Sequence, residues 1–246
     1  MQLRLTKAVK LIAIICFAMF VIQQTADQFF GANLLRWFAL VPSALMLDYR
    51  FWQVFTYAFL HGDVMHLFLN LMMLVFIGSE IEASWGTPRF LRFYFFCSIS
   101  AGLFYLFLQL FMGGATLHTP MVGASGAIYG LLMAYGLLFG ERVLLFMMLF
   151  PMKAKHFIWI LVAVEFMSTV FSPRGGVAGA AHLGGMAAGF LYLWGWGRFL
   201  QIRSKPFGQG SSKKTVKKKR SADHLRLVKG APNDPSDRED GPKTWH

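Results

Sequence analysis

The sequence predicts an all-α membrane protein: a bundle of six transmembrane helices with both termini in the cytoplasm. The first observation is composition, because 56% of the 246 residues are hydrophobic and the mean hydropathy is +0.49, too apolar for an ordinary soluble domain. The second is that charged residues, Gly and Pro divide the chain into apolar stretches of roughly helix-spanning length. These stretches cover residues 8–24, 64–81, 92–112, 122–140, 156–172 and 178–199.

Basic residues around these stretches predict the orientation. Three of them lie within positions 4–10, and the segment 23–27 is a poor small-x-small cleavage site, so we expect a retained helix rather than a removed signal peptide. The positive-inside rule then places the N-terminus in the cytoplasm. The loops after the second and fourth stretches are also basic. The predicted external loops hold only Arg36, Arg50 and Arg174.

Two connecting segments have unusual apolar content. The first external loop, residues 25–63, is amphipathic and rich in aromatic side chains, so we expect it to lie partly in the interfacial zone. The apolar run at 143–150 has eight residues, which is too few to cross a bilayer, and we expect it at the interface as well.

The C-terminal segment differs from the rest of the chain in charge. Residues 203–246 hold 12 of the 24 Lys and Arg residues together with five acids, a net charge of +7. Gly, Ser, Pro and Asp surround the basic run at 213–220, a composition typical of disorder. We therefore divide the chain into a membrane domain at 1–200 and a disordered cytoplasmic tail at 201–246. A basic tail on that side favours binding to anionic membrane lipid over nucleic acid.

Several polar residues fall at one depth of the predicted bundle. The second, fourth and sixth helices all run from outside to inside, and Ser125 and His182 each lie 16 residues before a charged residue at the inner end. At the rise of an α-helix, both lie about 24 Å above that charge. On the second helix, His66 and Asn70 lie about 24 and 18 Å above Glu82. The count predicts that these polar side chains meet several ångströms below the external surface.

A serine beside a histidine at this depth indicates nucleophilic catalysis. His182, as a neutral imidazole, can accept the proton of the Ser125 hydroxyl. The oxyanion of a tetrahedral intermediate needs preorganised donors. Asn70, the ring N–H of His66 and the backbone at the start of the fourth helix can supply them.

Small residues and an aromatic residue near the serine are expected to shape this site. Gly123 and Ala124 precede Ser125, and the glycine lets backbone and substrate approach closely. Tyr129, one turn after Ser125, can pack against the histidine. The Gly-x-x-x-Gly pattern at 185–189 favours close helix packing, which would bring the histidine near the serine.

Other groups are predicted to take no part in the reaction. No carboxylate falls at the depth of the serine in these three helices, so we predict a Ser–His dyad. Glu165 lies about 15 Å above Lys155, near mid-bilayer, and we expect a hydrogen-bonded structural role for it. The sequence lacks Gly-x-Ser-x-Gly and His-Glu-x-x-His. Cys16 and Cys97 have no metal-binding spacing, so we expect no metal and no cofactor.

Three motifs resemble those of the rhomboid family of intramembrane serine proteases, in its bacterial branch. In order on the second, fourth and sixth helices they are His61-Gly62-Asp63-Val64-Met65-His66-Leu67-Phe68-Leu69-Asn70, Gly123-Ala124-Ser125-Gly126-Ala127-Ile128-Tyr129-Gly130 and Ala181-His182-Leu183-Gly184-Gly185-Met186-Ala187-Ala188-Gly189. The similarity covers about residues 40–200. One departure is visible in the first loop, where the Trp-Arg of many members reads Trp52-Gln53.

The resemblance implies a six-helix fold with a Ser125/His182 dyad and with Tyr129 stacked on His182. It also implies an oxyanion hole formed by His66, Asn70 and the backbone of the fourth helix. The implied activity is cleavage of transmembrane segments of other proteins near their external ends, without a cofactor, in the bacterial inner membrane. The alternative is a non-proteolytic membrane protein, either an adaptor of this family or a small-solute or proton channel. The sequence leaves the substrate and the oligomeric state open.

Overall fold

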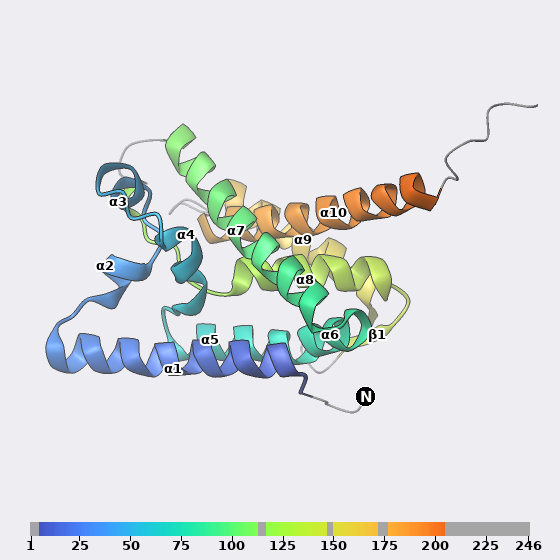
Figure 1. Ribbon diagram of the computed structural model, residues 1–246, viewed down its shortest axis with the longest axis horizontal. Coiled ribbons are helices and arrows are strands. Elements are labelled where there is room, and N and C mark those ends of the chain that lie inside the picture. The colour runs from blue at the N-terminus through green and yellow to red at the C-terminus, as the bar shows by residue number, and fades with distance from the viewer. Residues whose placement is uncertain (1–4, 113–116, 147–149, 172–176, 205–246) are drawn as a thin grey trace, which may run out of the picture. The chain divides into compact units, whose positions relative to one another are not determined.

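The predicted helical character is confirmed by the computed structural model, which describes residues 5–112, 117–146, 150–171 and 177–204 (Figure 1). The chain divides into two units, residues 1–204 and 205–246. The predicted disordered tail lies almost entirely outside the described residues, so the boundary near residue 200 stays a prediction.

The N-terminal half begins with a long helix and continues through a loop of short ones. The long helix is α1 (Lys7–Phe30). The loop contains α2 (Leu34–Phe38), α3 (Pro42–Leu47), α4 (Gln53–Thr56) and the 3-10 turn η1 (Tyr57–Phe59). The second predicted stretch forms one continuous helical segment with a π-helical turn in its middle: α5 (Val64–Met73), η2 (Leu74–Gly78) and α6 (Ser79–Trp85).

The C-terminal half holds four longer helices and one hairpin. The helices are α7 (Thr87–Met112), α8 (Ser125–Leu138), α9 (Ala154–Phe171) and α10 (Val177–Ser204). Between α8 and α9, strands β1 (Val143–Phe146) and β2 (Phe150–Lys153) pair antiparallel, with Val143 opposite Lys153. The apolar run at 143–150 was predicted only as an interfacial segment, and hydropathy alone did not predict these strands.

Four helical segments in the described part of the chain are long and apolar enough to cross a membrane. They are Lys7–Phe30, Val64–Trp85, Thr87–Phe111 and Ala154–Phe171. Helix α8 is apolar but shorter, with 14 residues, and α10 has 28 residues. A helical membrane protein is therefore confirmed, whereas six spans and their orientation remain a proposal.

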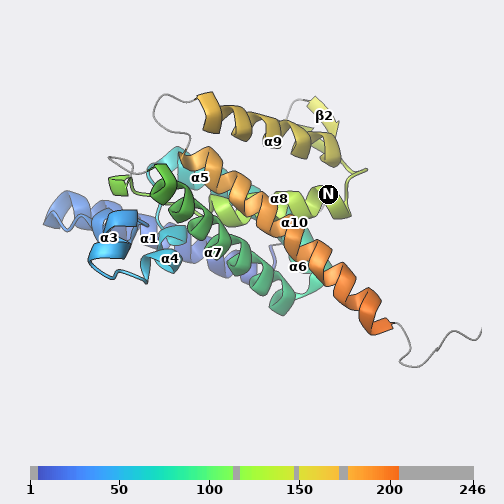
Figure 2. The same ribbon diagram turned by 90° about the horizontal axis from the view of Figure 1, so that it is seen from above.

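Helix α8 packs against most of the other long elements of the domain. It contacts α10, α7, α9, η2 and α5, and Figure 2 shows α10 running between α7 and α9. The contact between α8 and α10 is made by glycines. A Cβ on Gly185 would lie 2.0 Å from the carbonyl oxygen of Gly126, and a Cβ on Gly189 would lie 2.8 Å from that of Gly130. The close packing predicted from the Gly-x-x-x-Gly pattern is confirmed, because only glycine allows two backbones to approach this closely.

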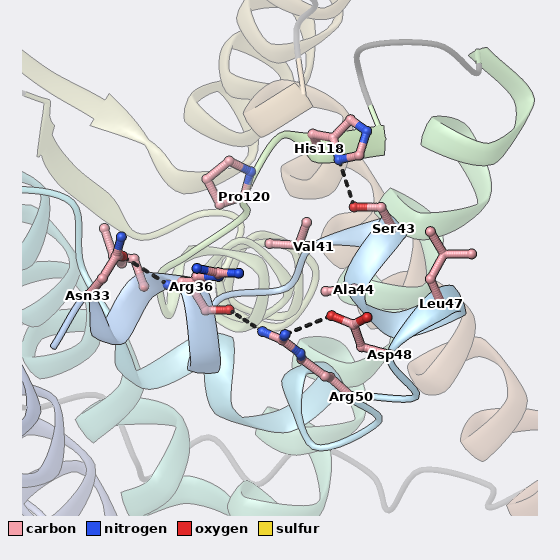
Figure 3. A pocket seen from close by; sticks show the side chains of 11 residues that line it. Asn33, Arg36, Val41, Ser43, Ala44, Leu47, Asp48, Arg50, His118 and Pro120 are labelled. Carbon is pink, nitrogen blue, oxygen red and sulfur yellow. Dashed lines mark hydrogen bonds and ion pairs between the residues drawn. The ribbon is translucent and has the colours of Figure 1, made fainter.

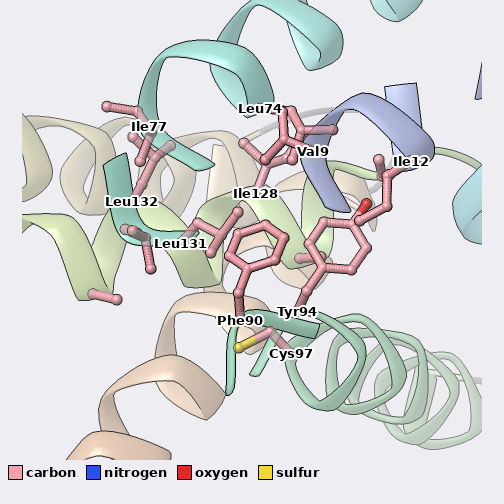
Figure 4. Packing of buried hydrophobic residues seen from close by; sticks show 14 of the residues in the cluster. Val9, Ile12, Leu74, Ile77, Phe90, Tyr94, Cys97, Ile128, Leu131 and Leu132 are labelled. Carbon is pink, nitrogen blue, oxygen red and sulfur yellow. The ribbon is translucent and has the colours of Figure 1, made fainter. Parts of the chain in front are cut away.

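The hydrophobic core joins α1 to the inner helices. Figure 4 shows side chains of α1, η2, α7 and α8 converging: Val9, Ile12, Leu74, Ile77, Phe90, Tyr94, Cys97, Ile128, Leu131 and Leu132. Cys16 and Cys97 are buried free thiols in this core, in keeping with the expected packing role.

The start of α1 is held by a residue from the second helical segment. Thr6 occupies the N-cap position of α1 without capping it through its own side chain. Instead, the carboxylate of Glu82 accepts the backbone N–H groups of Ala8 (2.9 Å) and Val9 (3.0 Å) and the hydroxyls of Thr6 and Thr87. A negative charge at a helix N-terminus is favoured by the unpaired N–H groups and the helix dipole.

The hairpin carries an exposed ion-pair cluster at its base. Lys153 and Lys155 both donate to the carboxylate of Glu141. Their hydrogen bonds lower the pKa of Glu141 to about 2, so this group stays charged across the physiological range.

Candidate active site

Ser125 is the first residue of α8, and Gly123 sets the backbone conformation that leads into this helix. Gly123 has a φ of +113°, which side-chain-bearing residues rarely adopt, and its N–H donates to the carbonyl of Tyr57 (2.9 Å). Ala124 is the N-cap residue, and its carbonyl accepts the first helical bond, from Ile128. The N–H groups of the first turn, including that of Ser125, therefore precede the hydrogen-bond ladder of α8.

The imidazole of His182 meets this serine. Nε2 of His182 lies 2.8 Å from Oγ of Ser125, within hydrogen-bond distance. Ser125 is buried at 9% exposure and His182 is partly buried. The contact between Gly126 and Gly185 explains how the two side chains meet, because these glycines follow Ser125 by one residue and His182 by three.

Tyr129 lies against the other face of the histidine. Its ring stacks on the ring of His182, with centroids 4.1 Å apart and planes 5° apart. The Tyr129 hydroxyl donates to the carboxylate of Glu165. The tyrosine therefore restrains the imidazole from one side and links it to α9.

Glu165 lies much closer to the histidine than its predicted depth suggested. Its Oε1 is 3.1 Å from Nδ1 of His182, although the N–H direction is not aligned for a good hydrogen bond. Counting from Lys155 gave a height on the helix axis, but it said nothing of helix tilt, of which face Glu165 occupies or of side-chain reach. The expectation of no carboxylate at the depth of the serine concerned the second, fourth and sixth predicted helices. Glu165 belongs to the fifth, where a hydrogen-bonded structural role was expected.

His66 and Asn70 lie on one face of α5, whose first turn is capped by Asp63. The carboxylate of Asp63 accepts the backbone N–H of His66 (2.8 Å). A Cβ on Gly123 would lie 2.7 Å from Nε2 of His66 and 3.7 Å from Oγ of Ser125, so the histidine and the serine border the same space. The Asn70 amide donates to the carbonyl of His66 (2.8 Å), and Asn70 is buried.

His61 contacts His66 on this side of the site. It is fully buried, its ring contacts the ring of His66 edge-on at 5.2 Å, and its carbonyl accepts from Gln23 (3.0 Å). Burial, reinforced by the neighbouring His66, lowers the pKa of His61 to about 4, so this imidazole is neutral at physiological pH.

A separate cavity of about 550 Å³ lies in the first loop (Figure 3). Its lining comes from residues 33–50, together with His118 and Pro120. Arg50 pairs with Asp48 (2.7 Å) and also donates to the carbonyl of Arg36 (3.0 Å), which ties the loop together. Among the described residues, no group of three His, Cys, Asp or Glu side chains is placed to hold a metal ion.

A serine, a histidine and a buried carboxylate thus lie together among apolar helices. Residues 48–199, more than half of the chain, match the family model of the Rhomboid domain, and the chain belongs to the rhomboid family. Members of this family are generally intramembrane serine proteases, although some are inactive. The protein is a multi-pass integral membrane protein.

Three relatives illustrate the range of the family. Rhomboid protein 1, mitochondrial, of Saccharomyces cerevisiae is 32% identical over 139 residues, 56% of this chain and 39% of the relative. Rhomboid-like protease 3 of Toxoplasma gondii is 32% identical over 83 residues, 32% of each chain. Inactive RHOMBOID-like protein 8 of Arabidopsis thaliana is 31% identical over 90 residues, 36% of this chain and 23% of the relative. The matches thus span less than half of each relative. All three are eukaryotic, so they do not support the predicted bacterial branch.

Proposed function

We propose that this protein is an intramembrane serine endopeptidase that cleaves transmembrane segments of other membrane proteins. The observation that carries the proposal is the 2.8 Å contact between Nε2 of His182 and Oγ of Ser125, at the start of an apolar helix. Family membership supports the same reaction. Polar groups in membrane helices are costly and are usually retained for function.

In the proposed mechanism, Ser125 attacks the scissile carbonyl carbon while His182 takes the hydroxyl proton. The new C–O bond gives a tetrahedral oxyanion, and His182 then returns the proton to the leaving nitrogen as the C–N bond breaks. Water hydrolyses the acyl-enzyme by the same route, with His182 again acting as the base. The chain needs no cofactor for these steps.

The proposed oxyanion donors border the space above Gly123. The backbone N–H of Ser125 belongs to the first turn of α8, where N–H groups are unpaired and the helix dipole favours negative charge. Nε2 of His66 faces the same space, and Gly62 N–H approaches Nδ1 of His66 (3.5 Å), which favours the tautomer with the proton on Nε2. Asn70 uses one amide N–H within its own helix and has a second to donate.

The substrate must unwind before it can react. A transmembrane helix hides its carbonyls in internal hydrogen bonds, so a scissile bond becomes accessible only where the helix is locally broken. Helix-breaking Gly or Pro near the scissile bond should therefore favour cleavage. The proposed cleavage site lies near the external end of the substrate helix.

The proposed topology has six spans, α1, α5–α6, α7, α8, α9 and α10, with both termini in the cytoplasm. In this arrangement, the basic tail faces anionic lipid. A reporter fused after His246 should read as cytoplasmic, and an external signal would contradict the topology. The predicted bacterial inner membrane has no support among the relatives described above.

The reaction is tested with purified protein in detergent and a transmembrane substrate. Wild type should cleave, and Ser125→Ala should lower turnover by at least about 10³-fold. Ser79→Ala is a matched control, because Ser79 is buried in α6 and its hydroxyl has no hydrogen-bond partner among the residues that the structure describes. Equal cleavage by Ser125→Ala would contradict the proposal. A wild type that cleaves nothing would favour a non-proteolytic role, such as an adaptor or a channel.

A further inference from the structure

Glu165 is a buried carboxylate on a helix that otherwise presents apolar side chains outward. Three residues of α9 are buried, namely Ala154, Ile158 and Glu165. Most of the exposed side chains of the helix are large and apolar, among them Trp159, Val164, Phe166, Met167, Val170 and Phe171. A charged residue inside a membrane helix is costly and faces the protein interior when it has a partner there. The partners of Glu165 therefore indicate its role.

Those partners are the two aromatic rings at the proposed active site. Oε1 of Glu165 accepts from the Tyr129 hydroxyl and lies 3.1 Å from Nδ1 of His182. The opposite nitrogen of His182, Nε2, lies 2.8 Å from Oγ of Ser125. The imidazole thus has a carboxylate at one nitrogen and the serine hydroxyl at the other.

Gly179 makes room for this carboxylate. It lies on α10, three residues before His182, and a Cβ there would lie 3.2 Å from Oε2 of Glu165 and 2.9 Å from its carbonyl oxygen. The same Cβ would lie 2.7 Å from the hydroxyl of Thr169. A side chain at position 179 would therefore push α9 and its carboxylate away from the histidine.

We propose that Glu165 is a positioning residue that holds His182 with its proton on Nδ1 and its free lone pair on Nε2, toward Ser125. This inference rests on the proposed function of Ser125 and His182. The carboxylate lies 3.1 Å from Nδ1, and a small rotation of the imidazole would let it accept the Nδ1–H and so fix the tautomer that a general base needs. When the serine proton moves to Nε2, the imidazole becomes positive beside the negative carboxylate. Glu165 keeps its charge throughout, and no further reactant is needed.

The surroundings of the histidine leave Glu165 as its closest anionic partner among the described residues. Ser125 and Tyr129 face it from α8, and Glu165 faces it from α9. His66 on α5 is the other titratable group close enough to influence it. A neutral His66 adds no negative charge, so the carboxylate is the group suited to stabilise an imidazolium.

The kinetic test compares two buried carboxylates. In detergent with a transmembrane substrate, Glu165→Gln should lower kcat on the order of 10²–10⁴-fold and leave KM within about threefold. Glu165→Asp keeps the carboxylate on a shorter side chain, so its kcat should fall between those of wild type and Glu165→Gln. Glu82→Gln is the matched control, because it makes the same chemical change at the α1 cap and should leave kcat within about twofold. A kcat for Glu165→Gln within about threefold of wild type would overturn the inference.

The second test does not depend on turnover. Nitrogen-15 NMR of histidine-labelled wild type at mildly alkaline pH, where an ordinary histidine is neutral, should show the His182 proton on Nδ1. The signal is assigned by its loss in His182→Gln. A proton on Nε2 in wild type, or an unchanged tautomer in Glu165→Gln, would overturn the inference. An inactive wild type would contradict the proposed function, whereas an active wild type indifferent to Glu165→Gln would contradict the positioning role alone.

Discussion

Two buried carboxylates in this domain have nearly equal burial and different surroundings. Glu82 is 3% exposed and Glu165 is 9% exposed. Glu82 accepts from backbone N–H groups and threonine hydroxyls, which keep their protons in any state of the protein. Glu165 contacts Tyr129 and an imidazole that can gain and lose a proton. Burial alone does not distinguish the two roles, but the chemistry of the partners does.

The two carboxylates are expected to affect different properties: Glu82 the stability of the fold, and Glu165 the rate of turnover. A carboxylate that satisfies fixed donors contributes mainly to the folded state, because removing it leaves those donors buried and unpaired. A carboxylate beside the proposed base contributes mainly to the step in which that base becomes charged. Changes near Glu82 should therefore lower stability, and changes near His182 should lower turnover.

Of the changes that distinguish turnover from stability, the larger effect is expected for Gly185→Ala, at the contact between α8 and α10. The added Cβ would lie 2.0 Å from the carbonyl of Gly126, so the helices must separate and the Ser125–His182 contact must lengthen. Turnover should fall at least about tenfold, because small misplacements of reacting groups are costly. Steady-state cleavage measures it.

Gly195→Ala is the control for this change. It lies on the same helix, where a Cβ would meet nothing within 4 Å. Its turnover should match wild type. If Gly185→Ala is as active as Gly195→Ala, the close approach of α8 and α10 does not set the geometry of the site.

A smaller effect, on stability, is expected for Glu82→Gln. The amide loses the charge at the start of α1 and one acceptor oxygen, which leaves a buried donor without a good partner and costs about 1–3 kcal/mol. The midpoint of thermal unfolding in detergent should fall by roughly 2–10 °C. Glu141→Gln, which removes an exposed carboxylate, should leave the midpoint essentially unchanged. Equal unfolding midpoints for Glu82→Gln and Glu141→Gln would contradict the stabilising role of Glu82.

The sequence predicted the helices well because each apolar stretch is long and is bounded by charged residues, Gly or Pro. It also predicted the approach of Ser125 and His182, because a motif on one helix and small residues on the other specify close packing. The strands β1 and β2 were missed, since the apolar run at 143–150 is short and Pro151 directly follows it.

Both carboxylate networks depend on information that one-dimensional counting lacks. Glu82 reaches residues 73 to 76 positions earlier in the chain, at the start of α1. Counting from Lys155 gives the depth of Glu165 along the helix axis. Its neighbours, however, depend on the tilt and rotation of α9, which the count does not give. The available signal was a lone carboxylate in an apolar run, which is costly unless partnered. Asking which titratable side chain could be that partner would have led to His182.

The most direct test of the account asks whether His182 activates Ser125. A fluorophosphonate reacts with an activated serine by forming an Oγ–P bond and releasing fluoride. We expect labelling of wild type at Ser125, detected by intact mass and peptide mapping, and no labelling of Ser125→Ala. Labelling of His182→Ala should be slower by at least about 10²-fold. Labelling of His182→Ala at the wild-type rate, or labelling of wild type at another residue only, would contradict it.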